Sequence, residues 1–170
     1  MSNNKRRSFK GKKEQSEFDQ TIVEIARVTR VMAGGKRMRF RAAVLVGDRK
    51  GRIGFGLAKG KDVSDSVGKA SKKAEKNLIK VNLTKGTIPH GVLQKYGAAK
   101  VMLKPAPVGT GIISGGSVRL VLELLGVENI VSKIMGGKNK INNVKATIEG
   151  LKKLKAVKSE KKDLNQENNK

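Results

Sequence analysis

The stretch VMAGGKRMRFRAAVLVGDRKGRIGFGLAKGKDV, residues 31–63, decides the fold of this chain. Apolar side chains occupy the even positions from Met38 to Val46, while arginines occupy positions 37, 39 and 41. Because successive side chains of a strand point to opposite faces, this alternation predicts one apolar face and one face that begins with arginine. The turn GDRKG (47–51) then leads into a third predicted strand, in which Gly54 and Gly56 leave one side open to another backbone.

The flanking residues extend this stretch into a β-β-β-α module. Residues 21–32 are rich in β-branched side chains but alternate imperfectly, which predicts a bulged first strand, joined to the second by the turn AGGK (33–36). A helix of about four turns is expected to begin at Asp62 or Ser64, because apolar residues recur at three- and four-residue steps. The stripe consists of Val63, Val67, Ala70, Ala74 and Leu78.

The pattern changes after this module and indicates a second one. A strand is expected over 98–106. A helix is expected over 117–126, with its C-terminal end at Gly126. Residues 127–140 fit either a short strand with a turn or a helical piece, and a last amphipathic helix is expected from Asn142 or Asn143. The predicted organisation is a disordered basic arm (1–17), a first domain (18–82), a connector (83–98), a second domain (99–155) and a disordered tail (156–170).

The charge of the chain indicates the class of its partner. Lysine and arginine number 38 against 14 aspartates and glutamates, a formal net charge of +24, which favours a polyanion such as a nucleic acid or an anionic membrane surface. No stretch approaches the roughly 18 apolar residues of a transmembrane helix, and the N-terminal residues lack the apolar core of a secretory signal. We therefore expect a cytoplasmic protein without a transmembrane segment, and the family resemblance described below implies that it has no membrane partner.

The sequence offers little for catalysis or metal binding. His90 is the only histidine, and it stands beside proline and glycine in a predicted loop. The chain has no cysteine, so it has neither disulfides nor thiolate metal sites. No pair of carboxylates is spaced like an acid–base couple. We expect no enzyme activity, no cofactor, no metal and no small-molecule substrate.

Two glycine-rich loops raise the question of a bound nucleotide, because backbone N–H groups at the start of a helix bind phosphate. A P-loop requires G-x-x-x-x-G-K-[ST], whereas Gly60 and Lys61 are followed by Asp62, and Phe55 stands five positions before Gly60. The loop GTGIISGGS (109–117) loosely resembles the phosphate loop of small-molecule kinases but lacks its adjacent hydroxyls. A phosphotransferase that uses this second loop is therefore an alternative. The first glycine-rich loop, residues 47–62, is expected to bind a nucleic-acid backbone.

The composition also indicates how RNA would be bound. Only five residues are aromatic, and Phe40 and Phe55 fall on apolar strand faces, which leaves little for stacking on unpaired bases. Contacts with phosphates, riboses and the shape of folded, double-stranded RNA suit the sequence better. Such binding weakens steeply with salt. A free double-stranded-RNA binder or RNA chaperone is a second alternative.

Several motifs in a fixed order identify a family. Residues 31–63 closely resemble the signature of the bacterial small-subunit ribosomal protein S-five family. GTIPH (86–90), LKPAPVGTGIISGGSVRLVLELLGVENI (103–130) and INNVKATIEGL (141–151) match its later blocks, so the resemblance covers roughly residues 18–154. It implies an α+β fold, in which a truncated double-stranded-RNA-binding-like β-β-β-α module precedes a second β/α module of the S-five C-terminal type.

The resemblance also implies a function. It describes a structural constituent of the small ribosomal subunit that binds small-subunit ribosomal RNA, helps assemble its central fold and supports translational accuracy beside proteins of the S-four and S-eight families. Residues 33–37 match the family loop that touches RNA near the spectinomycin-binding helix, with Ala33 where a lysine is common. A second departure lies at Ile141, which the family more often has after a proline.

The candidate RNA contacts are the cations and glycines of the turns and strands in residues 34–61, and we expect them to form one continuous surface. They are Gly34, Gly35, Lys36, Arg37, Arg39, Arg41, Arg49, Lys50, Arg52, Gly54, Gly56, Lys59 and Lys61.

Overall fold

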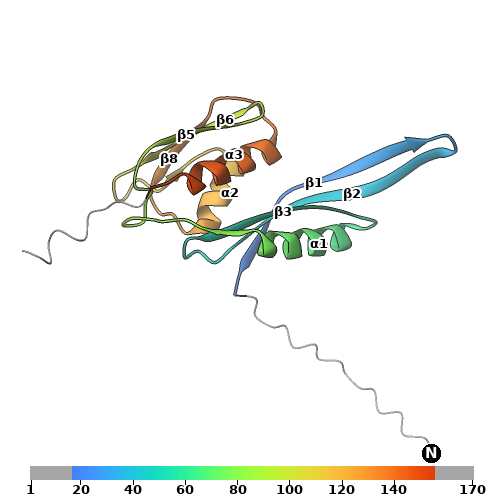
Figure 1. The fold of residues 1–170 in the computed structure, drawn as a ribbon, viewed down its shortest axis with the longest axis horizontal. Coiled ribbons are helices and arrows are strands. Elements are labelled where there is room, and N and C mark those ends of the chain that lie inside the picture. The colour runs from blue at the N-terminus through green and yellow to red at the C-terminus, as the bar shows by residue number, and fades with distance from the viewer. Residues whose placement is uncertain (1–16, 156–170) are drawn as a thin grey trace, which may run out of the picture.

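A computed structural model describes residues 17–155 and contains two four-stranded sheets and three helices in that range (Figure 1). The predicted disorder of the N-terminal arm, apart from residue 17, and of the tail from 156 onward lies outside the described residues. The α+β class and the division into two sheet-and-helix modules are confirmed.

The first sheet is antiparallel and has the strand order β1-β2-β3-β4. The predicted bulge is present, because the β1–β2 register shifts between Ile22 and Glu24. Strand β4 differs from the expectation, because the predicted helical stripe extends to Leu78. The helix instead stops at Lys76, and residues 78–80 form a strand. The elements of this module are β1 (Asp19–Met32), β2 (Gly35–Gly47), β3 (Arg52–Gly60), α1 (Val63–Lys76) and β4 (Leu78–Lys80).

Helix α1 covers one face of the first sheet. Ala70 and Ala74 of the helix are buried in one cluster with even-numbered residues of β2, among them Val44 and Val46. Small residues on both sides let the helix lie close to β3: a Cβ at Gly54 would meet the carbonyl oxygen of Ala74, and one at Gly56 that of Ala70. The backbone that approaches these glycines is therefore that of α1.

The second sheet has the order β5-β6-β8-β7, with β7 parallel to β8 and the other pairs antiparallel. The segment 127–140 forms a strand and a turn, and the last helix starts earlier than expected because Asn139 caps it, accepting hydrogen bonds from two backbone N–H groups. The elements are β5 (Val92–Tyr96), β6 (Ala99–Pro105), β7 (Ile112–Ile113), α2 (Gly116–Leu125), β8 (Ile130–Ile134) and α3 (Lys140–Lys152).

The connector is shorter than predicted, because β5 pairs with β6 along its whole length and belongs to the second sheet. A glycine ends α2 as expected. Gly126 adopts φ 85°, and its backbone N–H donates hydrogen bonds to the carbonyl oxygens of Glu123 and Leu122. The left-handed conformation at this position favours glycine.

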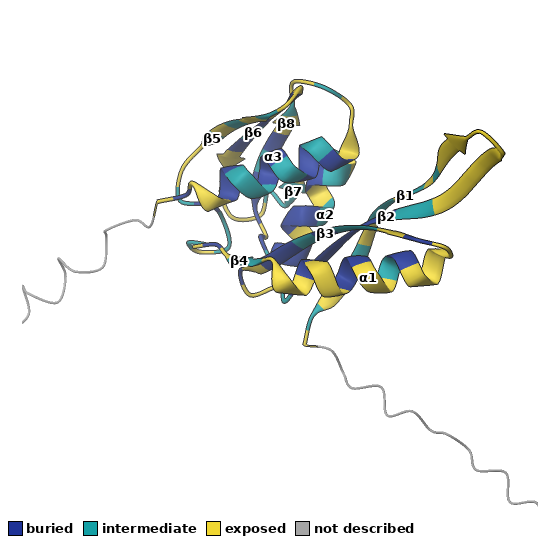
Figure 2. Cartoon of the chain, turned by 45° about the vertical axis from the view of Figure 1, so that its right-hand side comes forward, coloured by how far each residue is buried: buried dark blue, intermediate teal, exposed yellow. Residues whose placement is uncertain are grey.

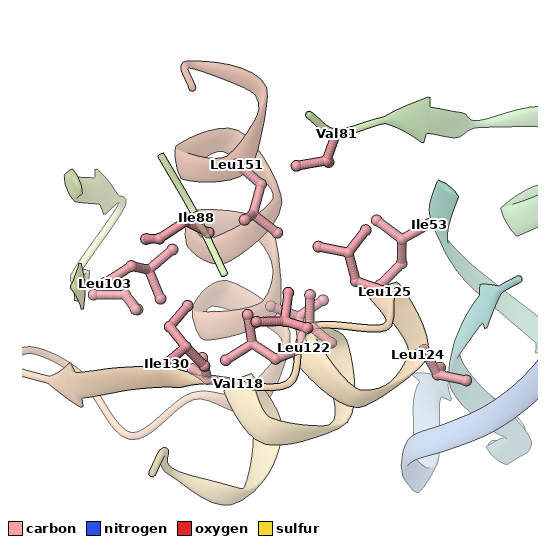
Figure 3. Close-up of a cluster of buried hydrophobic side chains, with 14 of the residues drawn as sticks. Ile53, Val81, Ile88, Leu103, Val118, Leu122, Leu124, Leu125, Ile130 and Leu151 are labelled. Carbon is pink, nitrogen blue, oxygen red and sulfur yellow. The ribbon is translucent and has the colours of Figure 1, made fainter. Parts of the chain in front are cut away.

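The two modules share one core. Helices α2 and α3 lie between the two sheets, so the molecule is layered as α1, first sheet, α2 with α3, and second sheet (Figures 1 and 2). Leu45 and Ile53 of the first sheet belong to the same buried cluster as Leu122, Leu125 and residues of the second sheet (Figure 3). Both faces of β2 are therefore buried over residues 42–46.

The turn between β2 and β3 fastens the modules together. The backbone N–H groups of Arg49 and Gly51 donate to the carbonyl oxygens of Leu124 and Leu125, at 3.0 Å each. These carbonyls belong to the last turn of α2, where no intrahelical donor is available. A Cβ at Gly126 would meet the carbonyl oxygen of Arg49, so close docking requires glycine there.

Candidate nucleic-acid interface

The outer halves of β1 and β2 form a two-stranded ribbon that projects from the body of the protein (Figure 2). Pairing continues from Arg27 opposite Phe40 to Met32 opposite Gly35 at the tip. Residues 29–39 are all exposed, and neither α1 nor the second module covers them. An exposed ribbon of this kind has no core of its own to form, so its side chains are free to bind a partner.

One face of this ribbon carries most of its cations. Arg30 pairs directly with Arg37, and Val28 pairs with Arg39. Directly opposed residues point to the same side of the sheet, and alternation places Arg37, Arg39 and Arg41 on that side together. Lys59 of β3 lies opposite Arg41 and adds a further cation. We call the side chains of Arg30, Arg37, Arg39, Arg41 and Lys59 the arginine face.

The arginine face is largely without internal counterions. Within residues 17–155, Arg41 is its only member in an ion pair, with Glu24 at 3.8 Å. Two arginines opposed across a strand pair repel each other, which is unfavourable for the isolated chain. The face borders a groove of about 270 Å³ lined by Arg30, Arg37, Arg39 and Lys59. Such a surface is complementary to a polyanion.

The ribbon tip is open to close approach. A Cβ at Gly34 or Gly35 would have no atom within 4 Å, and Gly35 adopts φ 135°, a conformation that L side chains rarely take. Lys36 and Arg37 follow directly on the strand and are exposed. Backbone and cations are therefore presented together at residues 34–37.

The second basic group has a different environment. Arg49 forms an ion pair with Asp19 at 2.9 Å, and Arg52 forms one with Asp48 at 2.6 Å while its guanidinium lies 5.2 Å from the ring centre of Phe18. Burial tends to raise the pKa of Asp48, but the side-chain hydrogen bond from Arg52 and the backbone N–H groups of Arg52 and Lys50 outweigh it and lower that pKa. Arg49 and Arg52 therefore have acidic partners within the fold, whereas Arg30, Arg37 and Arg39 have none among residues 17–155.

The expectation of one continuous surface is wrong. Arg37 and Gly47 are ten positions apart on β2, and a strand rises about 3.3 Å per residue. Gly47 pairs with Ile53, which is next to Arg52. The two basic groups thus lie about 33 Å apart, at opposite ends of the first sheet. Lys59 and Lys61, both exposed, lie at the base of the ribbon and belong with the first group.

Two of the predicted RNA contacts, Gly54 and Gly56, must be withdrawn, and Arg30 must be added. Gly54 and Gly56 are buried under α1, so they do not offer their backbone to RNA. The repeated glycines in β3 correctly signalled close backbone approach, but the partner is a helix of the same chain. Arg30 was missed, although the register of the AGGK turn would have placed it opposite Arg37.

The alternative of a phosphate-binding loop before α2 finds no support in its geometry. The side-chain oxygen of Asn129 accepts hydrogen bonds from the backbone N–H groups of Gly109, at 3.0 Å, and Gly111, at 3.1 Å. Two of the donors that a phosphate would need are therefore occupied. Residues 17–155 contain no cluster of three His, Cys, Asp or Glu side chains able to hold a metal ion. Among these residues no helix has both the length and the hydropathy of a membrane span.

Comparison with protein families now identifies the two modules. Residues 18–82 match the model of the ribosomal protein S5 N-terminal domain, and residues 94–165 match that of the ribosomal protein S5 C-terminal domain. The chain belongs to the ribosomal protein S5 family. The resemblance in the sequence is confirmed, and the two matched regions correspond to the two sheets.

Membership in the S5 family indicates the class of ligand that the chain binds. S5 proteins are structural, non-enzymatic constituents of the ribosome that bind ribosomal RNA and contact other ribosomal proteins. A ribbon on which Arg30, Arg37 and Arg39 have no acidic partner among residues 17–155 fits this role, because guanidinium groups bind phosphate oxygens by paired hydrogen bonds.

Proposed function

We propose that this S5 protein holds small-subunit ribosomal RNA with its β1–β2 ribbon, helps to assemble the central fold of that RNA, and supports the accuracy of translation in the cytoplasm. The observation that carries the proposal is the arginine face, in which Arg30, Arg37 and Arg39 have no carboxylate partner among residues 17–155. Its expected protein neighbours are members of the S-four and S-eight families.

The mechanism is electrostatic positioning. Cations on a protruding ribbon reach phosphates that the body of the protein does not touch, and the bare tip at Gly34 and Gly35 admits the RNA backbone closely. Each neutralised phosphate releases counterions, so affinity falls with salt by nearly one power of its concentration per contact. The shared core of the two modules fixes the base of the ribbon relative to the second module.

The test compares two double variants with equal loss of charge. Arg37→Gln with Arg39→Gln removes two cations of the arginine face, and Arg49→Gln with Lys50→Gln removes two at the far end of the sheet. We expect the first pair to lower affinity for small-subunit ribosomal RNA at least tenfold and the salt slope by about two, with a smaller effect of the second pair. Equal effects would contradict the proposal.

Specificity and accuracy need their own readouts. Competition with an unrelated RNA duplex separates a ribosomal protein from a free duplex binder, for which both RNAs would bind alike. Small subunits carrying the Arg37 and Arg39 double variant should misread codons more often than wild-type subunits in a reporter assay. An unchanged error rate together with normal assembly would remove the accuracy part of the proposal.

The ribbon tip also leads to a prediction about an antibiotic. Its residues match the family loop near the spectinomycin-binding helix, and Gly35 has a backbone conformation that a larger residue would strain. We expect Gly35→Val, or deletion of Lys36, to change the spectinomycin concentration that halts growth. Ala33→Ser, a small change beside them, is the control. Unchanged inhibition in both variants would contradict this role of the tip.

A further inference from the structure

The second sheet has one face that no element of the described chain covers. Helices α2 and α3 pack on its inner face, where Val101 and Leu103 of β6 are buried. The alternate residues of β6, Lys100, Met102 and Lys104, point to the outer face, which forms the last layer of the molecule (Figure 2). Its exposure gives that face room for a partner.

Four lysines stand together on this outer face. Lys95 of β5 lies directly opposite Lys100 of β6, and Lys133 of β8 lies opposite Met102. Lys133 is therefore the diagonal neighbour of both Lys100 and Lys104, at a Cα separation of about 7–8 Å. All four side chains are exposed. We call Lys95, Lys100, Lys104 and Lys133 the lysine array.

The fold alone does not explain this array. Like charges directly opposite each other on neighbouring strands destabilise a sheet, and in residues 17–155 none of the four lysines forms an ion pair. Lysines protect edge strands from aggregation, which accounts for Lys95 on β5. Protection of an edge does not account for Lys100, Lys104 and Lys133, because β6 and β8 are central strands.

The chemistry of the array favours RNA over protein. Lysine is depleted from protein–protein interfaces, whereas it is a common donor to phosphate oxygens. The apolar neighbours Leu93 and Met102 can support the aliphatic stems of the lysines while their ammonium groups reach outward. An acidic protein segment would be bound better by the arginine and aromatic side chains typical of hot spots, and the outward-facing residues of β5, β6 and β8 include neither.

We propose that the lysine array binds the phosphate backbone of a second RNA segment. The array and the ribbon tip lie toward opposite ends of the molecule (Figure 1), so one chain bound through both would tie together two separate parts of the RNA. This inference rests on the proposed function, because it extends RNA binding from the first module to the second.

The experiment uses the full chain and small-subunit ribosomal RNA. One variant replaces all four array lysines with glutamine. Its matched control, called the dispersed control, replaces four exposed lysines of three separate chain segments outside the array, Lys85, Lys138, Lys140 and Lys155, so that both variants lose the same charge. A third variant replaces the array lysines with arginine, and circular dichroism verifies that each variant is folded. Binding is measured over a series of salt concentrations.

We expect the glutamine variant to lower affinity at least tenfold and to reduce the salt slope by two or more, with a change below one for the dispersed control. The arginine variant should bind like wild type. Equal slopes for the glutamine variant and the control would overturn the inference while leaving the ribbon result standing. Unchanged RNA affinity with reduced incorporation into subunits would assign the face to a protein partner, which also overturns it. Failure of the wild-type chain to bind this RNA would reject the proposed function itself.

Discussion

Arg30 and Arg27 lie three residues apart on β1 and point to opposite faces of the ribbon. Arg30 belongs to the arginine face opposite Arg37, whereas Arg27 pairs with Phe40 on the other side. We expect Arg30→Gln to weaken binding to small-subunit ribosomal RNA several-fold and to lower the salt slope by about one. Arg27→Gln removes the same charge and should have a smaller effect. Filter-binding measurements over a series of salt concentrations give the affinity and the salt slope of both variants. A larger loss of affinity for Arg27→Gln than for Arg30→Gln would place the RNA on the opposite face of the ribbon.

The lowered pKa of Asp48 in the β2–β3 turn predicts how the unfolding free energy changes at acid pH. Burial favours its neutral form, but the hydrogen bonds from Arg52 and Lys50 favour the carboxylate more strongly, so its pKa in the folded protein lies below the ordinary value of 3.8. The stability that it contributes is therefore present above the unfolded-state pKa and is lost as the pH falls through the folded-state pKa.

Asp48→Asn should accordingly reduce the dependence of stability on acid pH. Urea unfolding between pH 5 and pH 2 is expected to show a smaller loss of unfolding free energy for this variant than for wild type. Glu75→Gln removes an exposed carboxylate from α1 and serves as the control. If both variants follow the wild-type curve, the turn does not hold Asp48 as described.

At the scale of elements, glycine has opposite effects on stability in α1 and in β3. A Cβ at Gly56 would collide with the backbone of Ala70 and Ala74, whereas a Cβ at Gly68 on the exposed side of α1 would meet nothing within 4 Å. We expect Gly56→Ala to destabilise the protein by about 2–3 kcal/mol through overpacking. Gly68→Ala should stabilise it by about 0.5–1 kcal/mol, because alanine has the higher helix propensity. Chemical denaturation measures both, and a stabilising Gly56→Ala would contradict the packing of α1 on β3.

At the scale of the whole molecule, the shared core makes the two modules one cooperative unit. Leu122 of α2 is fully buried in the cluster that contains Leu45 and Ile53 of the first sheet. Leu122→Ala should cost about 3 kcal/mol, and hydrogen exchange should accelerate in β2 as well as in β6. Leu93→Ala, at a residue that is 54% exposed, is the control. Acceleration confined to the second sheet would indicate two independent domains.

Much of the fold followed from local patterns. The alternation over 36–46, the turn GDRKG and the stripe of α1 depend on neighbours in the sequence, so strands β1 to β3 and helix α1 were predictable. Gly126 was recognisable as the end of α2 for the same reason. The limits of the second module were less predictable. Residues 78–80 and 92–96 became strands through pairing with distant partners, β3 and β6.

The candidate site was only partly predictable. The cations of the ribbon could be named, and the glycines at its tip are as exposed as expected. The roles of Arg49, Arg52, Gly54 and Gly56 were not predictable, because each depends on a contact between elements: a carboxylate opposite an arginine, or a helix over a glycine.

The sequence by itself determined the elements of the first module, the basic character of the chain and its membership in the S5 family, because these follow from residue type and short-range order. Only the tertiary structure decided which cations remain without a partner. Ion pairs at the β2–β3 turn and the register of the β1–β2 and β5–β6 pairs separate the arginine face and the lysine array from other basic residues. Charge is a property of each residue, but its availability to RNA depends on which groups the fold brings beside it.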